Sequence, residues 1–523
     1  MKKILFVLLI AIVGCSAQAR LPGYLYLRLS SDPTTLDPAY IVDVSGGGVA
    51  AKLYGGLMRF DEEANILPDM ASSFEISPDG RTYTFHLRPG IKFSNGRAVT
   101  ARDFKYSFER VLSPVTKSPR TWLFDRIAGS DEFMAGKASE VSGIKTPDDL
   151  TVLIELRKPF GPFLGLLAMP GGYVVPREEV ERWGDGFSDH PSGTGPYTLE
   201  KWEHAVRILL KANPAYYDDR PKLAGICYRV IPEDLTCVAE FERGYLDAIS
   251  VPAPEFARYT KDPKWKDKVL SRTGMNIYYL GMNCSRPPFD NVLVRRAVSM
   301  AVDRRRILDT VYEKRGVLAY GPAPLPLLPL PPCCLDAYPY NYDPQEARKL
   351  LAQAGYKDGL SVKIYIGADQ EVLDVVEVVQ DYLAHAGIKA DIVQLEWSAY
   401  KEAVNKGDAD LFWLSWQADY PDPENFLYPV FFSGNFGSAG NRARFADAEF
   451  DDIILKAQSE PDISKRRALY RTAEHRVVEM APWVFFWHKE DFVVRQAWVK
   501  GFRLYPINNA DRGLGVELTK PLQ

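Results

Sequence analysis

The sequence is poor in the residues that build metal and catalytic centres. Its 523 residues include only six His and six Cys. No two His have zinc-site spacing, no Cys-x-x-Cys pair occurs, and no acidic cluster has the spacing of a calcium loop. A P-loop and a Gly-x-Ser-x-Gly nucleophile elbow are also missing. We therefore expect no metal and no cofactor, and we expect that the protein is not an enzyme.

The chain also lacks an excess of charge of either sign. Its 64 Lys and Arg nearly balance its 68 Asp and Glu, which gives a net charge of −4 at pH 7. That balance provides no basic surface for nucleic acid and no strong attraction to anionic membranes. Beyond the N-terminus, no segment reaches the ~18 apolar residues of a membrane-spanning helix. Neither a nucleic-acid partner nor a spanning helix is expected.

The N-terminus is the one long apolar stretch. After a short basic start, Ile4 to Val13 is an apolar segment of about ten residues, too short to span a bilayer. Gly14-Cys15 then closes a stretch that resembles the lipobox of bacterial lipoproteins, whose cysteine is acylated and becomes the mature N-terminus. Ala17-Gln-Ala19 is an alternative site for ordinary signal peptidase. We favour a signal peptide at 1–15 with lipidation at Cys15, which places the mature protein outside the cytoplasm and attaches it to a membrane only through that lipid.

Disulfide bonds are permitted outside the cytoplasm. Five Cys remain after the one in the lipobox, so at least one stays unpaired in a monomer. Cys333 and Cys334 are adjacent, which makes a bond between them strained. Cys227 and Cys237 are close in sequence and are the best candidates for a disulfide.

Alternating strand and helix patterns predict an α/β protein of several domains. The length of 523 residues exceeds what one hydrophobic core accommodates, so two or three domains are expected. Apolar runs at 360–366, 388–395 and 410–416 are typical of buried strands, and an apolar stripe at 371–386 is typical of a helix. Strands that alternate with helices indicate a mainly parallel sheet.

The last of these strands ends at a turn that is dense in acid and proline, Asp419-Tyr-Pro-Asp-Pro423. In open α/β sheets, ligands bind at the carboxyl ends of the strands, where Asp419 would place a carboxylate among aromatic residues. An Asp before Tyr-Pro is also a common turn former. The residues alone leave both interpretations open.

One long segment connects the sequence to a known family. Between Leu67 and Ser107 it contains the turn signals Ser77-Pro-Asp-Gly80 and Asn95-Gly96 and a variant capping box, Thr100-Ala-Arg-Asp103, at the start of a helix. This segment resembles the signature region of the bacterial extracellular solute-binding proteins of the peptide and nickel class, the receptors of peptide-importing ABC transporters. Further motifs follow in the family's order: Thr35-Leu-Asp-Pro38, Gly193-Thr-Gly-Pro-Tyr197, Asn213-Pro-Ala-Tyr-Tyr217, Phe289 to Ala297, Tyr342 to Arg348, Ala354-Gly-Tyr356 and the Asp419 turn.

The resemblance implies a two-lobed periplasmic-binding-protein fold of type II, with a hinge and an extra domain inserted in the first lobe. The implied boundaries are 21–55, 170–272 and 488–523 for a discontinuous lobe I, 56–169 for the insert, and 273–487 for lobe II. Strands near 273–282 and 484–494 would cross the hinge, so that the lobes close by small backbone changes.

The resemblance also implies how a ligand is held. In peptide-binding members the peptide lies extended between the lobes and pairs through its main chain, as an added strand does. Its free amino terminus is held by an Asp, and Asp419 falls on the matching position of the motif. The backbone of Asp43, Val44 and Ser45 matches the strand that pairs with the peptide.

Aromatic residues complete the expected site. Trp397 and Trp416 match positions that line the cleft, and Trp413 is a further candidate, with core packing as the alternative interpretation for these Trp. Trp122 and Arg120 belong to a loop of the insert that could face the cleft, where Arg120 could meet a peptide carboxylate.

We therefore predict a substrate-binding receptor of an ABC transporter, a monomer in the periplasm that captures short peptides for a membrane permease. Within the family, the alternative ligands are nickel chelates, haem, opines and oligosaccharides, and the lack of a His or Cys cluster argues against direct metal capture. An exported hydrolase would need a nucleophile beside a base, for which no motif is present. A chaperone-like protein at the cell surface stays an open alternative.

Overall fold

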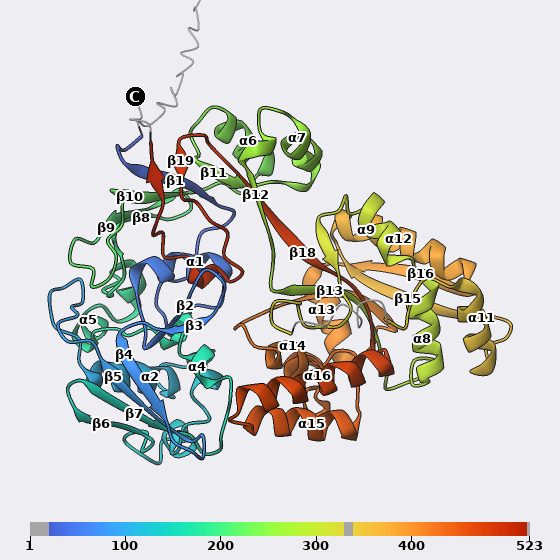
Figure 1. Ribbon diagram of the computed structural model, residues 1–523, viewed down its shortest axis with the longest axis horizontal. Coiled ribbons are helices and arrows are strands. Elements are labelled where there is room, and N and C mark those ends of the chain that lie inside the picture. Colours follow the sequence, from blue (N-terminus) through green and yellow to red (C-terminus); the bar gives the residue numbers. More distant parts are fainter. Residues whose placement is uncertain (1–19, 329–337, 520–523) are drawn as a thin grey trace, which may run out of the picture.

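The computed structural model describes residues 20–328 and 338–519, and Figure 1 shows them as two bodies connected by crossing strands. The fold is α/β with two lobes, as predicted. The expected signal peptide with Cys15, and the adjacent Cys333 and Cys334, lie outside the described residues. In the described part of the chain, no helix combines the length and apolar character needed to cross a membrane.

The strand β18 (Trp483–Arg495) belongs to both lobes and joins their sheets. Its first half pairs antiparallel with β13 (Asn276–Met282) and β14 (Gly316–Leu318). Its second half pairs antiparallel with β11 (Ala248–Ser250) and β12 (Val269–Thr273). Figure 1 shows β12 and β18 running side by side between the two bodies. The chain thus crosses at the two segments that the sequence predicted to form the hinge.

Lobe I is built on one end of this twelve-stranded sheet. Here β1 (Tyr24–Leu29) pairs parallel with β10 (Gly225–Val230), and β9 (Arg207–Ala212) and β8 (Tyr197–Glu203) continue antiparallel. Side chains alternate between the faces of a strand, so β1 contributes to two separate cores. The other elements of lobe I are α1 (Val44–Leu53), α5 (Arg177–Trp183), α6 (Asp234–Glu242), α7 (Phe256–Lys261), β19 (Val499–Lys500) and β20 (Glu517–Leu518).

The disulfide expected between Cys227 and Cys237 is not formed. Both residues are free and buried in the same apolar cluster, Cys227 on β10 and Cys237 on α6. Burial raises the pKa of Cys227 to about 11 and also raises the pKa of Cys237. The two thiols are therefore neutral and pack as small apolar side chains, a role that closeness in sequence does not reveal.

The insert has its own antiparallel sheet, in the strand order β4–β5–β7–β6. Its elements are β2 (Met58–Phe60), β3 (Ile66–Pro68), β4 (Ala71–Ile76), β5 (Thr82–Leu87), α2 (Ala101–Leu112), α3 (Ser130–Met134), β6 (Ile144–Asp148), β7 (Thr151–Glu155) and α4 (Phe163–Leu166). Phe104 and Phe108 of α2 are fully buried in the core of the insert, at helical spacing.

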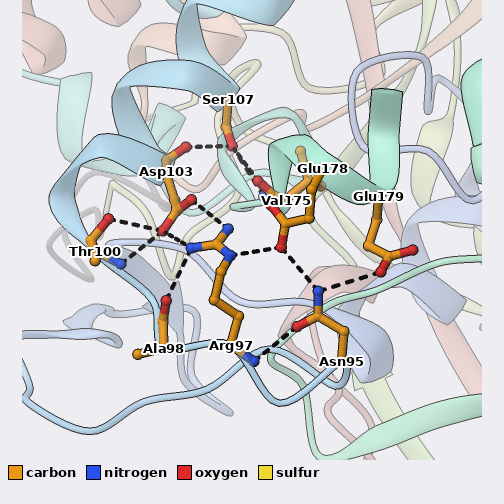
Figure 2. A network of polar contacts seen from close by, with 9 residues as sticks. All are labelled: Asn95, Arg97, Ala98, Thr100, Asp103, Ser107, Val175, Glu178 and Glu179. Atoms are coloured by element: carbon orange, nitrogen blue, oxygen red, sulfur yellow. Dashed lines mark hydrogen bonds and ion pairs between the residues drawn. The ribbon is translucent and has the colours of Figure 1, made fainter. Parts of the chain in front are cut away.

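The capping box predicted at Thr100 fixes the start of α2, as Figure 2 shows. The Asp103 carboxylate accepts hydrogen bonds from the Thr100 N–H at 2.8 Å and from its hydroxyl at 3.0 Å. The guanidinium of Arg97 binds the same carboxylate through two nitrogens, at 2.7 and 3.0 Å. Its Nε also donates to Glu178 of α5 at 2.6 Å. This network connects the insert to a helix of lobe I.

Lobe II occupies the other end of the large sheet. There β15 (Leu360–Gly367) pairs parallel with β16 (Ile388–Leu395) and β17 (Leu411–Gln417), whereas β13 pairs antiparallel with both β17 and β18. The expectation of a mainly parallel sheet therefore holds for three strands only. The helices are α8 (Val292–Ala301), α9 (Arg304–Thr310), α11 (Pro344–Gln353), α12 (Gln370–His385), α13 (Trp397–Lys406), α14 (Glu424–Phe431), α15 (Ala448–Ser459) and α16 (Ile463–Met480).

Candidate functional site

Asp419 lies at the carboxyl end of β17, on the sheet edge where the parallel strands β15 and β16 also end. The residue is half-buried. Burial raises the pKa of its carboxyl group, whereas Arg120 and a hydrogen bond from Asn425 lower it. A carboxylate that is partly removed from water gains most from a nearby positive charge.

Asn425, which the sequence did not single out, organises the turn that carries Asp419. It lies in the first turn of α14, is 2% exposed, and directs its side-chain amide back toward the end of β17. Its Oδ1 accepts hydrogen bonds from the Asp419 N–H at 3.0 Å and from Trp416 Nε1 at 3.3 Å. An Asn at the start of a helix is an ordinary pattern, so nothing in the sequence distinguished this one.

Arg120 approaches from the insert, just before the short helix η1 (Thr121–Leu123). Its Nε donates to the carbonyl of Ile41 at 2.8 Å, and its guanidinium lies 6.0 Å from the centre of the Trp122 ring. The Trp122 ring lies 6.4 Å from the ring of Tyr420, the residue after Asp419. These contacts join lobe I, the insert and lobe II at one place.

The charged groups of this region interact electrostatically. Burial lowers the pKa of the Arg120 guanidinium, and the carboxylates of Asp419 and Asp43 raise it. Arg120, Asp419 and Asp43, which are far apart in the sequence, therefore share one electrostatic environment. The structure brings these three predicted residues together with Trp122 and Trp416.

Trp413 is a correction, because the structure places it in the core of lobe II. It is 5% exposed, and its ring lies 4.6 Å from that of Phe486 and 5.7 Å from that of Trp487. Trp416 is half-buried on the other face of the sheet, because residues three apart on a strand point to opposite faces. Of these two tryptophans, only Trp416 remains a candidate for ligand contact.

Trp397 begins α13, directly after β16, and is 53% exposed. Its ring centre lies 5.7 Å from that of Tyr400 and 5.7 Å from the Lys401 ammonium. It stands at the same sheet edge as Asp419, with much of its surface free. A ligand-binding role for Trp397 stays a prediction.

The segment Asp43 to Ser45 is not the extended strand that was expected. Asp43 is the N-cap of α1, and Val44 and Ser45 form the first turn of that helix. The Asp43 carboxylate accepts hydrogen bonds from the Gly46 N–H and the Thr34 hydroxyl, each at 2.7 Å. Because an N-cap Asp starts a helix even before a run of glycines, α1 begins directly after it, at Val44.

The insert also touches lobe II away from Asp419. The Gly161 N–H donates to the carbonyl of Gln458 at 2.8 Å. A Cβ on Gly161 would lie 2.3 Å from a side-chain nitrogen of Arg466, so a larger residue here would force that side chain aside. The insert and lobe II are therefore in direct contact at this second place as well as at Tyr420.

Behind the Asp419 turn lies a second carboxyl group, Glu424, which is 1% exposed. Burial is the main cause that raises its pKa, to about 7. The Tyr420 hydroxyl donates to its Oε2, and Gln458 Nε2 donates to its Oε1 at 2.5 Å. No pattern in the sequence predicts that this acid is buried.

Glu424 should make the stability of the protein depend on pH. Its pKa is raised in the folded protein, so ionising it costs folding free energy. The free energy of unfolding should therefore fall as the pH rises from about 4.5 to about 7, and then level off. In Glu424→Gln this part of the pH dependence should disappear, so that urea unfolding midpoints match wild type at pH 4 and exceed it at pH 8. The exposed control Glu377→Gln should show the same dependence of the unfolding midpoint on pH as wild type. If Glu424→Gln also shows the wild-type dependence, Glu424 is not the group responsible.

Comparisons with known proteins found a matching family model and similar chains over most of the length. The family model of the bacterial extracellular solute-binding proteins, family 5 (middle region) matches residues 65–438. Heme-binding protein A of Haemophilus influenzae is 30% identical, with 93% of this chain and 91% of that protein covered. Di/tripeptide-binding protein 2 of Pseudomonas aeruginosa is 30% identical, with 96% and 97% covered. The unliganded open form of MppA, a periplasmic murein tripeptide-binding protein, superimposes with a TM-score of 0.81 at 26% identity, covering 96% of this chain and 98% of that chain.

Proposed function

Because the chain belongs to the bacterial extracellular solute-binding proteins of family 5, we propose that it is the receptor of an ABC importer and captures short peptides between its lobes. The observation that carries the proposal is the half-buried Asp419 carboxylate at the carboxyl end of β17, next to the contact with the insert. A carboxylate in this environment favours a ligand that brings a positive charge, and the free amino terminus of a peptide supplies one. The permease of the importer is the partner that takes over the ligand.

Binding and closure are coupled in this mechanism. The peptide ammonium contacts Asp419 of lobe II, while the rest of the ligand contacts Arg120 and Trp122 of the insert. A ligand that touches both sides stabilises the closed arrangement by its preference for that form. The crossing strands β12, β13 and β18 absorb the movement as the hinge. Closure then presents one surface to the permease.

Cellular location follows from the family. Its members are periplasmic solute-binding proteins, and this chain functions in the periplasm in our proposal. The segment 1–15 would direct export, and a lipid on Cys15 would hold a monomer at the membrane. The lobe and insert boundaries of the sequence analysis are kept as part of the proposal, with the end of lobe II at 487 falling inside β18.

A second candidate ligand comes from one relative. Heme-binding protein A is named for haem and is as similar to this chain as the di/tripeptide-binding protein. The half-buried aromatic side chains of Trp122 and Trp416 near Asp419 are compatible with a flat, apolar ring system as well as with a peptide. The identity of the retained ligand separates the two candidates.

Native mass spectrometry of soluble protein starting at Ser16, purified without denaturation, tests the proposal. A ladder of added masses that match short peptides is the expected result, and the masses then give the ligand length. A single added mass that matches a non-peptide would identify haem or another compact molecule as the ligand. Protein that stays empty and binds no added peptide would contradict the proposal.

Asn425→Ala should weaken peptide binding, because the turn that positions Asp419 loses its central side chain. The change leaves the Asp419 N–H and Trp416 Nε1 without their acceptor. It also removes the hydrogen bond from Asn425 to the Asp419 carboxyl group. Because a hydrogen bond to a charged group contributes about 1.5–3 kcal/mol, the dissociation constant should rise roughly tenfold to a hundredfold. Isothermal titration calorimetry measures the change, with Asn435→Ala as the matched control, since that amide bonds the Tyr428 carbonyl outside the turn. If both variants lose the same affinity for peptide, Asn425 does not contribute to binding more than an amide outside the turn does.

A further inference from the structure

A second pocket lies on the surface of lobe II, between the helices α9, α11 and α12. Figure 1 shows α11 and α12 on the side of lobe II that is remote from lobe I. None of the residues of the proposed peptide site lines this pocket, whose volume is about 560 Å³. Small-molecule sites in proteins have volumes of ~300–1,000 Å³, so the pocket is large enough for a small organic ligand.

One face of α12 forms a wall of the pocket. Its lining residues Val378, Asp381, Tyr382 and His385 are spaced i, i+3, i+4 and i+7, which brings them to the same face of a helix. The buried apolar stripe of α12 is a different face, which packs into the core of lobe II. The ring of Tyr342, which precedes α11, lies edge-on to the ring of Tyr382, with 5.2 Å between the ring centres. This wall of the pocket is therefore aromatic and partly apolar.

Arg306 of α9 and Arg348 of α11 contribute two guanidinium groups to the same pocket. Within residues 20–328 and 338–519, neither guanidinium has a hydrogen-bond partner or a carboxylate oxygen within 4.0 Å. Burial raises the pKa of the Tyr382 hydroxyl, with Asp303 adding to the effect, whereas Arg306 lowers it, so the Arg306 cation lies near that ring. Like charges that line one pocket repel each other, and an anion bound between them would turn this repulsion into attraction.

The acids of this region do not neutralise the two arginines. Among the described residues that line the pocket, Asp381 is the only one with a carboxylate, and that group lies 3.6 Å from His385 Nδ1. Asp303 is the N-cap of α9, and its Oδ1 accepts a hydrogen bond from the backbone N–H of Arg306 at 2.9 Å rather than from its guanidinium. The pocket therefore combines two permanent positive charges with one negative charge.

We propose that this pocket binds a phosphomonoester, with its phosphate between Arg306 and Arg348 and its organic part against Tyr342 and Tyr382. A phosphate monoester carries a charge of about −1.5 to −2 at pH 7 and has three acceptor oxygens, which two guanidinium groups can share. A carboxylate has one charge and two oxygens, so a single Arg satisfies it. The two tyrosine rings offer a face and an edge against which an apolar or aromatic group packs.

Calorimetric titration with phenyl phosphate and with benzoate tests the assignment, because the two probes share a phenyl ring and differ in the anion. Wild-type protein should bind phenyl phosphate at least tenfold more tightly than benzoate. Arg306→Gln and Arg348→Gln should each weaken the binding of phenyl phosphate at least tenfold and leave the affinity for peptides unchanged. Asp381→Asn should tighten the binding of phenyl phosphate, because it removes the negative charge from the pocket. The control Arg305→Gln removes an exposed Arg of the same helix that does not line the pocket and should change neither affinity.

Vesicles that contain phosphatidic acid distinguish the two sources of such a phosphate. Co-sedimentation of the protein with these vesicles, abolished in Arg306→Gln, identifies a lipid headgroup as the ligand. Protein that binds phenyl phosphate but stays in solution identifies a soluble phosphomonoester.

The remaining outcomes overturn the assignment. If wild-type protein does not bind phenyl phosphate, or binds benzoate equally well, the pocket does not recognise a phosphate. If Arg305→Gln weakens binding as much as Arg306→Gln does, the anion is attracted by general surface charge. If both pocket variants bind phenyl phosphate as wild type does, the phosphate is bound elsewhere. None of these results affects the proposed peptide receptor, whose binding is measured separately with peptides.

Discussion

Replacing Asp419 with asparagine should raise the dissociation constant for free-amine peptides roughly a hundredfold or more. Asn has nearly the same shape as Asp, so the turn and the hydrogen bond from its N–H to Asn425 remain. What is lost is the negative charge that faces the ligand ammonium in a half-buried site. Breaking such a pair by removing one partner costs about 3–5 kcal/mol, which corresponds to a factor of a hundred or more in affinity.

Calorimetry with the peptides that native mass spectrometry identifies measures this loss. Asp381→Asn is the matched control, because it removes the same charge from an exposed position of lobe II, on α12. Peptides with an acetylated amine should bind wild-type protein and Asp419→Asn alike, since they bring no ammonium. Unchanged affinity of free-amine peptides in Asp419→Asn would show that their amine is bound elsewhere.

The second large effect concerns the stability of lobe I. Arg512 and Asp69 form a buried ion pair, with side chains 6% and 0% exposed. Arg512 Nη1 donates to Asp69 Oδ1 at 3.0 Å, and the Tyr217 hydroxyl donates to the same oxygen at 2.7 Å. The pair joins the C-terminal segment to the start of the insert. Arg512→Met should destabilise the protein by about 3–5 kcal/mol, because it leaves the Asp69 carboxylate buried without its cation.

Urea unfolding followed by circular dichroism measures this change. Arg503→Met is the control, because Arg503 pairs with Glu62 at the surface, where its side chain is 59% exposed. Surface ion pairs contribute about 0–1 kcal/mol, so the control should unfold nearly as wild type does. Equal unfolding midpoints for Arg512→Met and Arg503→Met would show that the buried pair contributes no more to stability than the surface pair does.

Local patterns in the sequence predicted much of the fold. The capping box at Thr100, the strands β15 to β17 and the position of Asp419 at a strand end follow from rules that act over a few residues. The family resemblance added the two lobes and the hinge. The resemblance was wrong at Asp43 to Ser45, where a local signal, the N-cap side chain of Asp43, starts the helix α1 in place of the expected strand.

The parts that could not be predicted depend on contacts between distant segments. Trp413 and Trp416 have the same chemistry, and only the register of β17 decides which of them reaches the core. Asn425 binds the Asp419 N–H and Trp416 Nε1 only because α14 folds back onto the end of β17. The orientation of Arg120 depends on the carbonyl of Ile41, which belongs to another part of the chain. No periodicity or spacing in the sequence contains these contacts.

A crystal structure of the protein with the peptide it retains tests the central claim most directly. We predict that the ligand lies between the lobes, with its amine nitrogen about 3 Å from an oxygen of the Asp419 carboxylate. A peptide whose amine contacts other groups would contradict the role of Asp419. A peptide bound outside the lobe interface, for example in the surface pocket lined by Arg306, Arg348 and Tyr382, would contradict the site as a whole.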